Sequence, residues 1–183
     1  MNNTVYLIPG RGKKLDCYIG DIINSLGFDV CGREIISPFS NRHFPAQLDT
    51  IKKDLTSLFW NIESKLIGHS YGSYLLMHAL AELKPFPGKI LLFSPVLGAA
   101  INIQRLYSSR PPRADKLLEL SKANKFPTPQ SLDIHTGADD NGCDHNLAER
   151  IGSSISTAKV NILQNQGHKL SNAYIKKTIR EFL

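Results

Sequence analysis

The stretch that decides the fold of this chain is Gly68-His69-Ser70-Tyr71-Gly72. It follows the short, strand-like run at residues 65–67 and precedes residues 73–83, which read as a helix. A Gly-x-Ser-x-Gly sequence between a strand and a helix predicts a nucleophile elbow, a turn so tight that its serine takes a strained backbone conformation. The hydroxyl of Ser70 is then expected to stand exposed at the carboxyl end of a sheet and at the amino end of a helix, whose dipole favours negative charge.

Short β-prone runs alternate with helical patterns through the rest of the chain. Strands are predicted at residues 4–8, within 28–36, and at 65–67, 89–93, 132–136 and 159–163. Helices are predicted at residues 15–26, 46–60, 73–83, 114–123, 145–155 and 172–182. Such alternation predicts an α/β fold: a parallel sheet with helices on both faces, in a three-layer sandwich. The 183 residues suit one domain, because the sequence has no interdomain linker, repeat or low-complexity tract.

Composition and charge exclude several classes of function. The net charge is +6, but the basic residues are dispersed in small groups, which disfavours a nucleic-acid interface. The chain has no run of eighteen apolar residues, so no membrane span is expected. Its three cysteines, Cys17, Cys31 and Cys143, are an odd number and widely spaced. They predict reduced thiols in a cytoplasmic protein, and neither a disulfide framework nor a zinc site. The amino end has no secretory-signal pattern, which agrees with a cytoplasmic location.

Three of the predicted strand-to-helix turns carry residues that acyl transfer requires. Ser70 follows the third strand, Asp139 and Asp140 follow the fifth, and His168 follows the sixth. The carboxyl ends of parallel strands meet at one edge of a sheet, so these side chains are expected to lie close together. A serine hydroxyl needs a base that takes its proton, imidazole suits that role near neutral pH, and a carboxylate can orient the imidazole. The sequence therefore predicts a Ser-His-Asp triad.

Over nearly its whole length the chain resembles a small, single-domain α/β-hydrolase. The resemblance is carried by residues 68–72, by the Gly137-Ala138-Asp139-Asp140 turn, and by Gly167-His168 before the last helix, in the chain order Ser, Asp, His. It implies a six-stranded sheet with strand order 2-1-3-4-5-6, lacking the two leading antiparallel strands of the full family fold. It also implies a serine hydrolase that needs no cofactor and no metal.

The resemblance also implies roles for individual residues. The family pattern Gly-x-x-Asp makes Asp140 the expected triad acid, with Asp139 as the alternative because loop turns can shift by one residue. The turn at Pro9-Gly10-Arg11 resembles the family's His-Gly oxyanion turn, with proline in place of the histidine. The expected oxyanion hole consists of the backbone N–H groups of Tyr71 and Arg11, with Gly12 as the alternative for the second.

The predicted function is cleavage of a carboxylic ester or thioester through an acyl-enzyme. The alternatives are a non-catalytic binding protein on the same fold, or an acyltransferase or amidase that uses the same triad. The expected partner is a small acyl ester or thioester. It could be anionic, because Arg11, Lys13 and Lys14 would lie at the rim of the pocket, although a solvated basic turn is the competing interpretation.

Residues 97–130 are the irregular stretch of the sequence, at the place where the family often inserts a cap. Two interpretations compete for its apolar side chains: they line an acyl pocket, or they cover the edge of the sheet. The residues concerned are Leu97, Ile101, Ile103, Leu106 and Tyr107.

Other polar residues have simpler predicted roles. His69 is expected to pack beside the elbow and His78 on the helix that follows it. Ser94, at the end of the fourth strand, either lines the pocket or is a hydrogen-bonded turn serine. The acids around His145 could bind a metal, but a triad acid and a helix cap at Asp144 explain them better.

Overall fold

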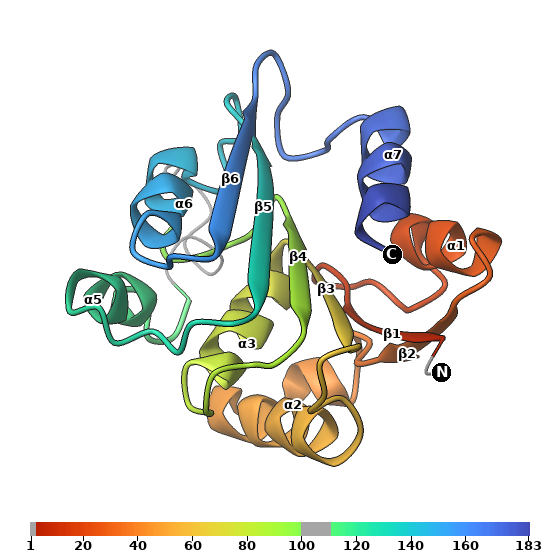
Figure 1. Cartoon of the computed structure of the whole chain (residues 1–183), viewed down its shortest axis with the longest axis horizontal. Helices are drawn as coiled ribbons and strands as arrows, with labels where there is room; N and C mark the ends of the chain where they lie inside the picture. Colours follow the sequence, from red (N-terminus) through yellow and green to blue (C-terminus); the bar gives the residue numbers. More distant parts are fainter. Residues whose placement is uncertain (1–2, 100–110) are drawn as a thin grey trace.

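The structure is a computed structural model that describes residues 3–99 and 111–183, and a parallel sheet forms its centre (Figure 1). Its strands are β1 (Thr4–Ile8), β2 (Asp29–Gly32), β3 (Lys65–His69), β4 (Lys89–Phe93), β5 (Ser131–Gly137) and β6 (Ala158–Leu163). Their order in the sheet is β2-β1-β3-β4-β5-β6, and every neighbouring pair is parallel. The predicted fold class and strand order are therefore confirmed.

Helices cover both faces of the sheet and make the outer two layers. They are α1 (Tyr18–Ser25), α2 (Phe44–Leu58), α3 (Tyr71–Leu80), α5 (Lys116–Lys122), α6 (His145–Gly152) and α7 (Asn172–Phe182), with the 3-10 helix η1 (Phe39–Asn41) before α2. The first and last helices, α1 and α7, lie together on one face, and α2, α3, α5 and α6 lie on the other (Figure 1).

The sheet has a hydrophobic core on each side, and β1 shows why its sequence is apolar throughout. Val5 and Leu7 point into the core beneath α1 and α7, whereas Tyr6 and Ile8 point into the larger core beneath the other helices. All four side chains are at most 1% exposed. A strand buried on both faces has no solvent side, so the alternation of apolar and polar residues disappears.

The helix boundaries differ from the predicted ones by a few residues. α1 begins at Tyr18, three residues after the predicted start. α2 begins at Phe44, two residues early, and Pro45 occupies its first turn, where a missing N–H has no cost. α6 ends at Gly152, three residues before the predicted end.

The irregular stretch at 97–130 is only partly described. Its predicted helix at 114–123 is α5, which is two residues shorter at its start and one at its end. Leu97 is buried in the larger core. Ile101, Ile103, Leu106 and Tyr107 lie outside the described residues. Among residues 3–99 and 111–183, no helix has the length and apolar character needed to cross a bilayer.

Candidate active site

Ser70 lies in the tight turn between β3 and α3, with a backbone conformation that is rare for a residue with a side chain. Its φ is 53° and its ψ is −121°, and its backbone N–H donates to the Phe93 carbonyl at 3.0 Å. The strain of such a conformation is on the order of 1–3 kcal/mol, which only a firmly packed surrounding can sustain. The turn presents the serine hydroxyl at the carboxyl end of the sheet.

Steric contacts explain why glycine is needed two residues before and two residues after Ser70. A Cβ added to Gly72 would lie 2.1 Å from the Ile8 carbonyl oxygen and 2.3 Å from that of Pro9. A Cβ on Gly68 would lie 2.9 Å from the Cα of Ser73. Gly72 therefore allows α3 to approach the end of β1, and Gly68 allows β3 to approach α3. The elbow needs both of these close approaches.

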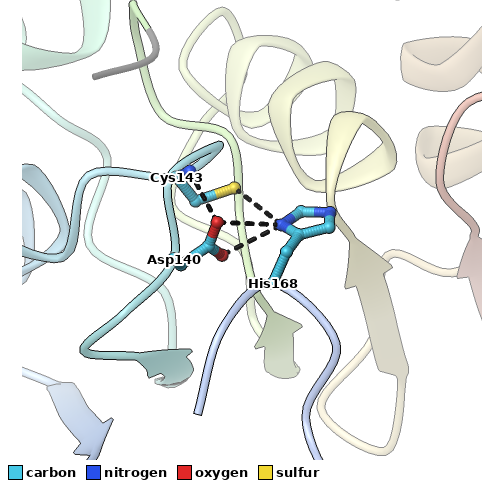
Figure 2. Close-up of side chains that lie close together, drawn as sticks. All are labelled: Asp140, Cys143 and His168. Carbon is cyan, nitrogen blue, oxygen red and sulfur yellow. Dashed lines mark hydrogen bonds and ion pairs between the residues drawn. The ribbon is translucent and has the colours of Figure 1, made fainter. Parts of the chain in front are cut away.

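His168, in the turn after β6, stands between Ser70 and an acid. Its Nε2 lies 3.0 Å from the Oγ of Ser70, and its Nδ1 lies 2.9 Å from one carboxylate oxygen of Asp140 and 3.2 Å from the other. Figure 2 shows the carboxylate beside one ring nitrogen while the other ring nitrogen faces away from it. The side chain of Asp140 is fully buried and that of His168 is 44% exposed. The three side chains form one hydrogen-bonded line.

Asp140 is the acid that contacts the imidazole, and the turn after β5 determines this choice over Asp139. The Oδ1 of Asp140 accepts the backbone N–H groups of Gly142 at 2.8 Å and Cys143 at 3.0 Å. Asp139 is exposed, and its own backbone N–H donates to the Gln166 carbonyl at 2.9 Å. The buried carboxylate is therefore held in place by two donors besides the imidazole.

Two backbone N–H groups near Ser70 are available as donors. Among the described residues, neither the N–H of Arg11 nor that of Tyr71, the first residue of α3, has a hydrogen-bond acceptor. The N–H of Gly12 donates to the Ile35 carbonyl at 2.9 Å, so the alternative donor is already occupied. The Arg11 guanidinium lies 4.2 Å from the centre of the Tyr71 ring, and this contact joins the two turns.

His69 packs beside the elbow, as the sequence predicts. Its ring lies 6.0 Å from that of His168, centre to centre. Burial, with a smaller contribution from the His168 charge, lowers the pKa of His69 to about 4. It is therefore neutral at pH 7 and adds no positive charge beside the His168 ring.

One group of side chains at this site has the composition of a metal site. Nδ1 of His168, a carboxylate oxygen of Asp140 and the sulfur of Cys143 lie within 4.8 Å of one another (Figure 2). The pKa of the Cys143 thiol is raised, by burial first and then by the Asp140 charge, and its S–H donates to the Ser94 carbonyl at 2.9 Å. A metal requires the thiolate, so these contacts fit a hydrogen-bonded thiol better than a ligand. His145, which lies among the acids that could bind a metal, is not in this group.

Asp144 and Ser94 have the simpler of their predicted roles, and Cys143 has one that was not predicted. Asp144 caps α6 by accepting the backbone N–H of Asn146. The hydroxyl of Ser94 donates to the His168 carbonyl at 2.7 Å, so it is a hydrogen-bonded turn serine. The contact of Cys143 with the site was missed, although its position three residues after Asp140 placed it in the same turn.

Comparison with known proteins identifies the fold. No protein-family model matches the sequence, and no curated protein matches it. Three solved structures are similar across their lengths: alpha/beta hydrolase domain-containing protein 10 from mouse, a lipase-esterase related protein from Clostridium acetobutylicum, and the carboxylesterase CesB from Bacillus subtilis. Their TM-scores are 0.67, 0.67 and 0.68 at sequence identities of 15%, 13% and 14%. The matches cover 97%, 98% and 98% of this chain and 88%, 94% and 82% of theirs. The chain has the α/β-hydrolase fold.

Proposed function

We propose that this protein is a serine hydrolase that cleaves a carboxylic ester or thioester through an acyl-enzyme. The observation that supports the proposal most is the unbroken line from the Ser70 hydroxyl through the His168 imidazole to the buried Asp140 carboxylate, with contacts of 3.0 and 2.9 Å. A base within hydrogen-bond reach of a nucleophile, itself oriented by a third group, is the arrangement that nucleophilic catalysis requires.

In the proposed acylation, the Ser70 oxygen attacks the substrate carbonyl carbon while Nε2 of His168 takes the serine proton. Asp140 accepts the hydrogen bond of the Nδ1–H group, which keeps its proton, and stabilises the imidazolium that forms. The oxygen of the tetrahedral intermediate takes the negative charge, and the N–H groups of Tyr71 and Arg11 donate to it. One such donor is typically worth about 3 kcal/mol of barrier.

The intermediate then collapses. The bond from carbon to the alcohol or thiol breaks, and the leaving group takes the proton from His168. The acyl group remains on Ser70 until water attacks its carbonyl carbon, with His168 as the base for that water. The second collapse releases the acid and returns the proton to the Ser70 oxygen. No cofactor takes part in these steps.

The names of similarly folded proteins support ester chemistry over amide chemistry. They include a carboxylesterase, a monoacylglycerol lipase from Paleococcus ferrophilus and a lipase-esterase related protein. A fold alone hosts many activities, so the weight of the proposal rests on the side chains.

Labelling with a fluorophosphonate probe tests the nucleophile. We expect wild type to be labelled and Ser70→Ala not to be. Ser121→Ala is the matched control, because it also removes a serine hydroxyl, one that lies on α5 and donates to the Arg150 carbonyl. Unchanged labelling in Ser70→Ala, or no labelling of wild type, refutes the proposal. A panel of esters, thioesters and amides of varied chain length then identifies the substrate class.

A further inference from the structure

Ser94 follows β4, a strand that carries none of the three proposed triad residues. Its φ is +41°, so Ser94, like Ser70, is one of the few residues other than glycine with a left-handed backbone. It is 1% exposed, and its backbone N–H donates to the His135 carbonyl of β5 at 2.7 Å. A strained backbone conformation persists only where the surrounding structure holds it, and the hydrogen bonds of Ser94 can do so.

Ser94 is bonded to the turns that hold the imidazole and the acid. Its hydroxyl donates to the backbone carbonyl of His168 at 2.7 Å. Its own carbonyl accepts the S–H of Cys143 at 2.9 Å. Cys143 in turn donates its backbone N–H to Asp140 at 3.0 Å, and its sulfur lies 3.5 Å from Nδ1 of His168. Figure 2 shows Cys143 beside both side chains.

The preceding residue completes the set of contacts. The carbonyl of Phe93 accepts the backbone N–H of Ser70 at 3.0 Å. Two consecutive residues, Phe93 and Ser94, therefore bond to all three turns that carry the hydroxyl, the imidazole and the carboxylate. In its left-handed conformation, Ser94 directs its hydroxyl to the turn that carries His168 and its carbonyl to the turn that carries Asp140.

We propose that Ser94 is a positioning residue, which fixes the backbone of His168 through its hydroxyl and the acid-bearing turn through Cys143. The proposal rests on the proposed function for its kinetic consequence, but the geometry it describes can be measured independently. His168 is the most exposed member of the line, and its turn lies after an edge strand. A displacement of about 1 Å at a reacting group can lower the rate by about a hundredfold.

Ser94→Ala tests the hydroxyl, with Ser121→Ala as the matched control for losing a buried serine. We expect Ser94→Ala to lower kcat for ester cleavage by about tenfold to a hundredfold while KM changes by less than about twofold, since substrate contacts are untouched. Ser121→Ala should lower the melting temperature comparably and leave kcat within about twofold.

The orientation of His168 can be followed without activity. The proton shared by its Nδ1 and Asp140 should give a low-field imidazole N–H resonance in the proton NMR spectrum. We expect that resonance to shift or broaden in Ser94→Ala and to stay unchanged in Ser121→Ala. If Ser70→Ala shows that the proposed function is wrong, this measurement still decides the positioning role. Wild-type kcat and an unchanged resonance in Ser94→Ala overturn the role of Ser94.

Two further variants keep the test decisive. Should Ser94→Ala not fold, Ser94→Gly also removes the hydroxyl but suits the left-handed φ, so it replaces Ser94→Ala with the same expected losses. At the other contact, Cys143→Ala should lower kcat and Cys143→Ser should restore it, because the serine hydroxyl can donate to the same carbonyl. Equal kcat in Cys143→Ala and wild type contradicts the part of the proposal that runs through Cys143.

Discussion

Two neighbouring carboxylates, Asp139 and Asp140, illustrate how much a single residue position decides in this protein. They have the same chemistry and follow the same strand, yet only Asp140 is buried against the His168 ring. Three donors surround the Asp140 carboxylate: the Nδ1–H of His168 and the N–H groups of Gly142 and Cys143. Ordinary side-chain properties cannot distinguish the pair, but hydrogen bonding does.

Asparagine at each position in turn tests that distinction. We expect Asp140→Asn to lower kcat by about 10⁴-fold, because the amide stabilises the wrong imidazole tautomer and cannot stabilise the imidazolium. The kcat of Asp139→Asn should stay within about twofold of the wild-type value, because Asp139 is exposed and substitutions at exposed positions have small effects. Ester hydrolysis measured on both variants, with circular dichroism to check folding, decides the matter. The reverse order of effects would make Asp139 the acid.

Gly72 gives a second prediction at this scale. Alanine is favoured over glycine in a helix by roughly 0.5–1 kcal/mol. At Gly72, however, its Cβ would lie 2.1 and 2.3 Å from two backbone oxygens, and overpacking of this kind costs about 1–3 kcal/mol. We expect the clash to prevail, so Gly72→Ala lowers both the melting temperature and esterase activity. Calorimetry checks the first effect, and a gain in melting temperature would contradict it.

Gly167→Ala is the steric control for that experiment. Although Gly167 stands beside His168, a Cβ there would approach only the Asp139 carbonyl oxygen, at 3.5 Å, which is ordinary contact. Its melting temperature should therefore match that of wild type.

At the scale of elements, the burial of His135, which lies on β5 and contacts α7, couples stability to pH. Nδ1 of His135 lies 2.7 Å from the Tyr174 hydroxyl of α7. Burial lowers the pKa of His135 to about 4, from about 6.5 in an unfolded chain. Between these two pH values the unfolded chain binds more protons than the folded one. The contribution of His135 to stability is therefore complete above about pH 6.5 and is lost as the pH falls toward 4.

His135→Phe should remove this pH dependence, because phenylalanine fills much of the same space and does not titrate. The free energy of unfolding of wild type should fall between about pH 7.5 and pH 5, and that fall should be smaller in the variant by about 1–2 kcal/mol. Urea unfolding at the two pH values measures it. His43 is exposed, and His43→Gln serves as the control. Its free energy of unfolding should fall between the two pH values by as much as that of wild type. Equal falls in wild type and His135→Phe would contradict the assignment.

For the whole molecule, the excess of positive charge bears on substrate choice. The net charge is +6, and Arg11, Lys13 and Lys14 are exposed in the turn after β1, beside the elbow. Among the described residues, no carboxylate lies within ion-pair distance of these three. We propose that this charge attracts an anionic ester or thioester, since a basic rim raises the local concentration of anions.

Removing one charge at a time tests this attraction. Arg11→Ala and Lys13→Ala should lower kcat/KM for an anionic ester by about threefold to tenfold more than for a neutral ester of the same acyl length, and added salt should reduce the difference. The Arg11 backbone N–H remains in the variant, so its proposed contact with the oxyanion is kept. Lys53→Ala, on the exposed surface of α2, is the control. Equal losses on both esters would exclude the preference.

The sequence by itself determined the elements and their kinds, because hydrophobic periodicity is a local property. Apolar runs at residues 4–8 and 89–93 gave strands with those same bounds, and the helix at 172–182 has the predicted bounds as well. The order of the strands came from the resemblance to a family. Helix starts were less accurate because caps and tertiary contacts set them, and hydrophobic periodicity does not show these.

Only the tertiary structure decided how the turns meet. The sequence placed Ser70 and His168 at the same edge of the sheet, but the choice of Asp140 depends on a turn whose backbone bonds to residues far along the chain. In the same way, the bond from Gly12 to Ile35 excluded a donor, and the contacts of Ser94 with His168 and Cys143 join residues 49 to 74 positions apart. Composition and spacing describe a residue and its neighbours along the chain. Hydrogen bonds between distant turns exist only once the sheet has brought those turns together.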